Sequence, residues 1–184
     1  VRDGKIWWSD TVAIPYRPMI GTLSTAPAMG APTSGPAGRY GGNMDIKEVT
    51  HGNTVYLPVF VTGALLHFGD AHAAQGDGEL CGTALEMPST ITATVDLIKG
   101  KSINWPRIRS NEEIMAVVTG TPMERSVARA YAELILWMEE EHGLPRWDGY
   151  NLCTQVGSIS VGHFILGTVA AKIRLEYVEG AVRR

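Results

Sequence analysis

The stretch from Asn43 to Glu86 holds an unusual density of side chains that can bind a metal ion or move a proton. It is rich in glycine and carries carboxylates, imidazoles, an amide and a thiol: Asp45, His51, His67, Asp70, His72, Gln75, Asp77, Glu79, Cys81 and Glu86. Carboxylate oxygens and neutral imidazole nitrogens are the ligands that zinc and harder cations take. One interpretation is therefore a metal or substrate site. The other is a polar turn, because Gly-Asp and Asp-Gly pairs suit backbone with positive φ.

Known short signatures do not decide between these interpretations. The sequence contains neither HExxH nor a paired CxxC, the regular zinc motifs. The GDGE run at residues 76–79 lacks the lysine and the strand-to-helix context of a phosphate-binding loop.

Several motifs in this stretch resemble the acetamidase/formamidase family in both order and spacing. They are GNMD ending at Asp45, VYLPV at 55–59, GAL at 63–65, GDAHAAQGDGE at 69–79 and CGTALE at 81–86. IPYRPMIGTLSTAP upstream, and WPRI and DGYNLCTQVGSISVGHF downstream, extend the resemblance over nearly the whole chain. Family members usually carry a long N-terminal part before the PMIG segment, whereas this chain reaches Pro18 after a short lead.

The resemblance implies hydrolysis of the C–N bond of a short aliphatic amide, such as formamide or acetamide, to a carboxylic acid and ammonia. A neutral amide is a poor electrophile, so its carbonyl must be polarised, a water or nucleophile activated, and the departing nitrogen protonated. In one route, a divalent metal activates water and Glu79 shuttles the proton. Zinc is the first choice for that metal and calcium the alternative, and the expected ligands are Asp45, Asp70, His72 and Glu86.

In a second route, the Cys81 thiolate attacks the amide, and His72 or a carboxylate takes the thiol proton. We favour the metal route, because the stretch offers four or more hard ligands but a single cysteine. The catalytic residues expected are therefore Glu79 and His72, with Cys81 as the alternative nucleophile. Substrate contacts are expected from Asn43, Gly69 and Gln75, which belong to the matching motifs.

A non-catalytic role stays open, because the family's usual N-terminal portion is not in this sequence. The chain could be a partner subunit or a small-molecule-binding module that works with a separate N-terminal chain or portion. The resemblance also implies a homo-oligomer. Trp7, Trp8 and Trp105 near strand ends agree with that expectation.

Length and composition predict a single domain over residues 1–184 and exclude two classes of partner. The net charge of −3 leaves no basic surface for nucleic acid or anionic membranes. No run approaches the ~20 apolar residues of a membrane span. Two cysteines are too few for a disulfide framework, which favours the cytoplasm.

The order of elements predicts a mainly β, sandwich-like α+β fold with one long helix and a short one. Expected strands are Lys5–Trp8, Ile20–Thr25, Thr54–Phe60, Ala64–Phe68, Thr90–Ile98, Ile103–Ile108, Ile114–Thr119 and Thr168–Tyr177. The long helix is expected to start at Thr121 as N-cap and to stop at Gly143, and the short one to cover Trp147–Gln155. Residues 26–42 are predicted to be a Gly/Pro-rich loop, and Arg183 and Arg184 a solvated tail.

Overall fold

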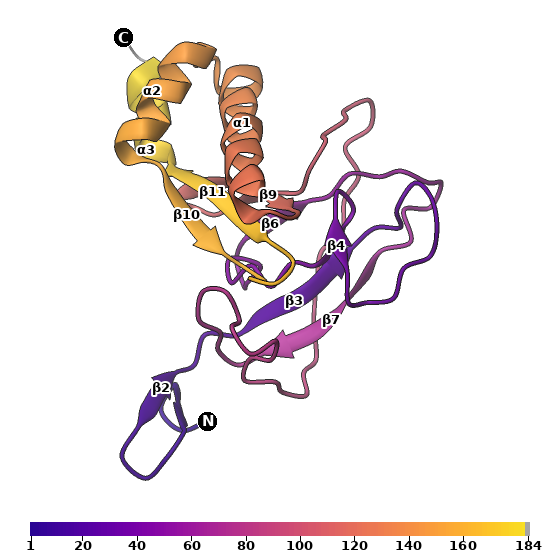
Figure 1. The fold of residues 1–184 in the computed structure, drawn as a ribbon, viewed down its shortest axis with the longest axis vertical. Helices are drawn as coiled ribbons and strands as arrows, with labels where there is room; N and C mark the ends of the chain where they lie inside the picture. The colour runs from indigo at the N-terminus through magenta and orange to yellow at the C-terminus, as the bar shows by residue number, and fades with distance from the viewer. Residues whose placement is uncertain (183–184) are drawn as a thin grey trace.

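The computed structural model describes residues 1–182 and contains two antiparallel sheets, a separate β-hairpin and three helices (Figure 1). The strands are β1 (Lys5–Trp7), β2 (Ala13–Pro15), β3 (Met19–Ser24), β4 (Ala37–Gly38), β5 (Gly41–Asn43), β6 (Thr54–Tyr56), β7 (His67–His72), β8 (Arg107–Arg109), β9 (Glu113–Thr119), β10 (Ser158–Val161) and β11 (Thr168–Arg174). The helices are α1 (Met123–His142), α2 (Arg146–Val156) and α3 (Leu175–Val182). The predicted α+β class is confirmed, with one more helix than expected.

Strand β9 lies at the centre of the molecule and contributes to two apolar cores. The five-stranded sheet has the order β10-β11-β9-β8-β6, and the four-stranded sheet has the order β4-β5-β3-β7. Ile114, Ala116 and Val118 of β9 pack in the core beneath α1, whereas Met115 and Val117 belong to the second core. Successive strand residues point to opposite faces, so an almost continuous apolar run is what a strand between two layers requires.

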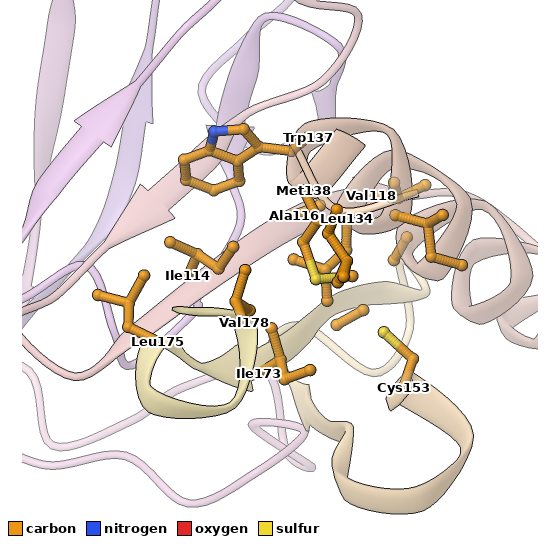
Figure 2. Close-up of a cluster of buried hydrophobic side chains, with 14 of the residues drawn as sticks. Ile114, Ala116, Val118, Leu134, Trp137, Met138, Cys153, Ile173, Leu175 and Val178 are labelled. Carbon is orange, nitrogen blue, oxygen red and sulfur yellow. The ribbon is translucent and has the colours of Figure 1, made fainter. Parts of the chain in front are cut away.

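Helix α1 covers one face of the five-stranded sheet (Figure 2). Leu134 and Met138 are fully buried at a spacing of four residues, which places them on one side of the helix, as the sequence predicts. Gly143 ends the helix with φ of 68°, and the N–H of Leu144 donates to Met138 O at 3.2 Å. This core also buries Cys153, and burial raises the pKa of its thiol to about 11.

The second core joins the opposite face of that sheet to the four-stranded sheet. Met44, Ile46 and Ile108 are completely buried there, and Ile20 and Leu23 of β3 pack against them. The structure is therefore layered as helix, sheet and sheet. The predicted sandwich describes only the two sheet layers of it.

The largest departure from the predicted elements concerns Thr90–Ile98, where alternation predicts a strand. The segment forms no strand, and residues 92–100 are exposed. Within residues 1–182, no backbone–backbone hydrogen bond outside helices and strands involves residues 88–105. A strand needs a neighbour to pair its N–H and C=O groups. The prediction is wrong because no strand within residues 1–182 pairs with this segment.

Several boundaries also differ. Residues 64 and 65 form a turn with φ of 55° and 53°, so the expected strand at Ala64–Phe68 starts later, as β7, and includes Asp70 and His72. Strands β6 and β8 are shorter than the predicted Thr54–Phe60 and Ile103–Ile108. Pairing that is confined to three residues in each strand accounts for the difference.

The remaining corrections concern element ends. Pro122, in extended conformation, occupies the N-cap of α1 without a side-chain cap bond, so Thr121 lies outside the helix. The expected strand at Thr168–Tyr177 stops at Arg174, because Leu175 and Val178 turn into the apolar core as α3. The predicted 26–42 loop contains β4 and the start of β5, and β10 was not predicted. Residues 183–184 lie outside the described residues.

None of the helices in the described part of the chain is long and apolar enough to cross a membrane.

Candidate active site

Strands β3 and β7 form the floor of the site. They pair with Ile20 opposite Ala71 and Thr22 opposite Gly69, which brings Gly21 beside Asp70. Asp45 follows β5, and its N–H donates to Gly21 O at 3.1 Å. Asp45 is thereby fixed above the middle of β3.

The side chains of Asp45, Asp70, His72, Glu79 and Glu86 meet at this point. His72 Nε2 lies 3.2 Å from Asp70 Oδ1, 3.3 Å from Glu86 Oε2 and 3.8 Å from Glu79 Oε1. His72 and Asp45 are both completely buried, while the Asp70 and Glu86 side chains are partly exposed. We call these five residues the carboxylate cluster. The sequence-based expectation that they lie together agrees with this geometry.

Gln75 fixes the orientation of the imidazole. Its Oε1 lies 2.9 Å from His72 Nδ1, and its Nε2 donates to Asp45 O at 2.6 Å. An amide oxygen only accepts, so Nδ1 carries the hydrogen and the Nε2 atom of His72 faces the carboxylates. Gln75 was expected to contact substrate, but in this structure its amide is bonded to two members of the carboxylate cluster.

Four buried polar atoms in and beside the cluster lack a hydrogen-bond partner among the described residues: Asp45 Oδ1, Asp45 Oδ2, His72 Nε2 and His163 Nδ1. Burial, followed by the charges of Glu79 and Asp70, raises the pKa of Asp45 to about 7. Burial also raises the pKa of Glu79. Burying carboxylates without a counter-charge is costly, so this arrangement fits a bound cation.

The imidazole responds to the same negative surroundings. Burial alone lowers the pKa of His72. The hydrogen bond that His72 donates to Gln75 and the nearby charges of Asp70 and Glu86 outweigh burial and raise the pKa. The cluster therefore attracts positive charge, either a proton or a metal ion.

The described residues offer three overlapping sets of ligand atoms, each set within 4.8 Å, that could hold a metal ion: Asp45–Asp70–His72, Asp45–Glu79–His163 and His72–Glu79–Glu86. Each set combines two carboxylates with one imidazole, a combination that fits zinc, whereas calcium would use the carboxylate oxygens alone. The first and third sets contain the four predicted ligands. The second set includes His163, which was not predicted as a ligand.

His163 reaches the cluster through contacts between distant parts of the chain. Gly78 pairs with His163 in an isolated parallel bridge, Gly78 N donates to Val161 O, and Phe164 N donates to Gly78 O, both at 2.9 Å. His163 N donates to Met44 O at 3.2 Å. In the sequence, His163 has no ligand-type neighbour, and the SISVGHF motif was its only signal.

Gly21 is a second residue that sequence reasoning missed. A Cβ at this position would lie 2.5 Å from both Asp45 Oδ1 and Asp70 Oδ2, and 2.9 Å from His72 Cε1. Only a residue without a side chain fits beneath the three groups. Its signal was the glycine of the PMIG motif.

Three members of the cluster adopt left-handed backbone: Asp45, Asp70 and Glu79 have φ of 50°, 62° and 44°. Such backbone is uncommon for residues other than glycine and is concentrated at functional sites.

Two cavities adjoin the cluster. The first, of about 580 Å³, is lined by Thr22, Ser34, Gly35, Asn43, His67, Gly69 and Asp70. The Thr22 hydroxyl donates to Asn43 Oδ1 at 2.8 Å, which leaves the Asn43 amide hydrogens for another acceptor. The second, of about 720 Å³, has Gln75, Glu79 and Cys81 in its wall.

Cys81 and His51 do not join the cluster. Both are exposed, and His51 lies in a turn. Cys81 Sγ donates to Thr83 O at 3.3 Å, and hydrogen bonds with the side chain and backbone of Thr83 lower the pKa of the thiol. No imidazole is among the hydrogen-bond partners of Cys81 in the described residues.

Comparison with known proteins decides the family. The sequence model of the Acetamidase/Formamidase family matches residues 11–138. The chain belongs to this family. It is 54% identical over 67 residues to an acetamidase from Mycolicibacterium smegmatis and 49% identical over 76 residues to a formamidase from Methylophilus methylotrophus. These segments cover 35% and 40% of this chain but 16% and 18% of the relatives.

Solved structures of acetamidase/formamidase relatives share the fold. The acetamidase from Yersinia enterocolitica superposes with a TM-score of 0.92 at 41% identity, over 95% of this chain and 54% of that chain. The acetamidase from Bacillus halodurans superposes with a TM-score of 0.90 at 29% identity, over 97% of this chain and 61% of that chain. The chain thus spans little more than half the length of these structures.

Proposed function

We propose that this chain carries the catalytic centre of an amidohydrolase that cleaves the C–N bond of a short aliphatic amide, such as formamide or acetamide. The observation that carries the proposal is the convergence of the family motifs between Asn43 and Glu86 on a buried carboxylate cluster with unpartnered ligand atoms. The relatives named acetamidase and formamidase support the substrate class.

In this proposal, the first cavity binds the amide. The free amide hydrogens of Asn43 donate to the substrate carbonyl oxygen, and the absence of a side chain at Gly69 leaves room for a small acyl group. Carbonyl polarisation at this point increases the electrophilicity of the carbon, which is what an unreactive amide requires.

Glu79 moves the proton. Its buried carboxylate accepts a proton as the water oxygen bonds to the amide carbon, and donates it to the nitrogen as the C–N bond breaks. The products are the carboxylic acid and ammonia. A raised pKa suits this double role, because it makes the carboxylate a better proton acceptor than an ordinary glutamate. His72 stays oriented by Gln75 throughout.

We assign cation binding to Asp45, Asp70, His72 and Glu86, with zinc as first choice because an imidazole is among the ligands, and calcium as the alternative. When bound, a divalent cation would supply Lewis-acid activation of water and carbonyl.

The Cys81 route has less support. The thiol is exposed and bonded to Thr83, whereas an acyl-enzyme mechanism needs a base in contact with the sulfur. Cys81→Ser should leave kcat/KM within about tenfold, whereas His72→Ala should lower it by about 10³-fold or more. The opposite ranking would assign the nucleophile to Cys81.

Ammonia release tests the function itself. The purified chain is assayed with formamide, acetamide, propionamide and urea, before and after chelation, with metal content measured by elemental analysis. Release that chelation abolishes and zinc restores is the expected result. No release across the panel, with zinc or calcium supplied, would favour the alternative of a non-catalytic partner subunit.

We also propose a homo-oligomer and a cytoplasmic location. The hairpin β1–β2 projects from the sheets, and Trp7 and Trp8 on it are exposed (Figure 1). Apolar side chains on such a projection favour contact with a second copy. Light scattering that finds a monomer across dilution would contradict this. The two free thiols support a reducing compartment.

A further inference from the structure

Residues 90–98 form a segment rich in apolar side chains, and residues 1–182 leave most of it exposed. Val95, Leu97 and Ile98 are 68%, 59% and 55% exposed. Figure 1 shows the chain between β7 and β8 leaving the sheets as a long irregular excursion. Its composition, TITATVDLI, is rich in β-branched residues, which favour strands and are unusual in a solvated loop.

The segment has the pattern of a strand whose sheet is missing. Ile91, Ala93, Val95 and Leu97 alternate with more polar residues, so one face of an extended chain would be apolar. Ile91 is half-buried, whereas Val95 and Leu97 are exposed, so the apolar face begins against this chain and continues into solvent. Neither edge of the segment is paired within residues 1–182.

Both limbs of the excursion are nevertheless anchored. At its start, Met87 N donates to Ala71 O at 3.0 Å. At its end, Lys101 pairs with Glu141 of α1, and Arg39 Nε donates to Asn104 O at 2.9 Å. Anchoring at both ends lowers the entropy lost when the segment between them binds a partner.

The solved relatives contain a further part of the chain beside this fold. In the Yersinia enterocolitica acetamidase, this fold occupies 54% of the chain, so nearly half of that chain lies outside it. We propose that residues 90–98 are a docking strand for this other part of the acetamidase/formamidase fold. That part supplies a β-strand that pairs with residues 90–98, and an apolar layer that covers Ile91, Val95 and Leu97.

Hydrogen exchange on a co-expressed pair tests the proposal. The tagged 184-residue chain is co-expressed with the part of the Yersinia enterocolitica acetamidase that this chain does not match, and purified by the tag. Exchange of the 90–98 amides is compared with that of the chain purified alone. The double variant Val95→Lys/Leu97→Lys tests the apolar face, and Met29→Lys, at a residue 89% exposed elsewhere, is the matched control.

We expect the acetamidase fragment to co-purify and to slow exchange at residues 90–98 by about tenfold or more. The double variant should lose the fragment while its α1 and β9 amides stay protected, and Met29→Lys should retain it. Three results would overturn the proposal: a folded wild-type chain that purifies without the fragment, a complex without protection at 90–98, or retention by the double variant. Protection at 90–98 in a dimer of the chain alone would assign the segment to a second copy instead.

Discussion

The region around the carboxylate cluster and the helix-covered region use their backbones differently. Within residues 1–182, six residues other than glycine have positive φ, and all lie between positions 3 and 79: Asp3, Asp45, Ala64, Leu65, Asp70 and Glu79. Between residues 107 and 182, only Gly143 and Gly167 do. A left-handed residue with a side chain costs about 1–2 kcal/mol. The site therefore contains strain that the helix-covered region avoids.

Their buried side chains differ as well. Beneath α1, the core is built from apolar residues such as Leu134 and Ile173. The cluster instead buries Asp45 and His72 with unpartnered atoms. We infer that the helix-covered region stabilises the fold, and that the site is held in an arrangement which is unfavourable until a cation binds.

The largest effect expected is on activity, from Asp45→Asn. The asparagine side chain has nearly the same shape as the aspartate but carries no charge, so a charged ligand is lost. The kcat/KM for ammonia release should therefore fall by about 10³-fold. The melting temperature in chelator should rise, because the neutral amide needs no counter-charge. A lower melting temperature in chelator would contradict the idea that Asp45 is an unfavourable buried charge.

A substitution in the core beneath α1 should lower stability and leave the metal site unchanged. Leu134→Ala removes a completely buried side chain and should lower the free energy of unfolding by about 2–5 kcal/mol, measured by urea denaturation. Zinc affinity, measured by calorimetry on the folded variant, should stay within about twofold. A large change in zinc affinity would mean that the two regions are not separable.

Gly21→Ala should sharpen the comparison, because it disturbs the cluster without removing a ligand. The added methyl must displace the oxygens of Asp45 and Asp70, so zinc affinity should fall by about 10–100-fold. Gly180→Ala is the control, since a Cβ there contacts nothing within 4 Å. Equal zinc affinity for wild type and Gly21→Ala would show that the floor beneath the cluster can move.

The smallest expected effect is on the pH dependence of stability without metal. The folded pKa of Asp45, about 7, exceeds its ordinary value, so the folded state binds more protons between about pH 4 and 7. Stability is therefore greatest below this window and declines as pH rises through it. The raised pKa values of His72 and Glu79 act in the same direction.

Melting temperatures in chelator across this window give the measurement. Asp45→Asn should flatten the decline. Saturating zinc should reverse it, because metal and protons compete for the same atoms. An unchanged slope in Asp45→Asn would assign the pH dependence to other groups.

Local patterns were enough to predict the scaffold and much of the cluster. The run around Ile114 and the spacing of Leu134 and Met138 predicted β9 and α1, because burial on a strand or a helix face leaves a period in the sequence. Asp45, Asp70, His72 and Glu79 were predicted together because they lie close in sequence and match family motifs.

What was missed depends on contacts between distant segments. Gly21 matters only because β5 and β7 place carboxylates above it, and His163 only because β10 runs beside Gly78. The segment at 90–98 has the periodicity of a strand, but the described part of the chain offers it no strand to pair with. Periodicity predicts what a segment can form, and pairing decides whether it does.

The bridge between Gly78 and His163 also determines when the site can form during synthesis of the chain. The ribosome releases the chain from its N-terminal end, so Asp45, Asp70 and Glu79 emerge well before β10. The loop that carries Glu79 gains its hydrogen bonds to Val161 and Phe164 only after those residues have been released. A nascent chain therefore exposes its carboxylates before it can arrange them. The loop that carries Glu79 therefore takes its final arrangement only after β10 has been synthesised.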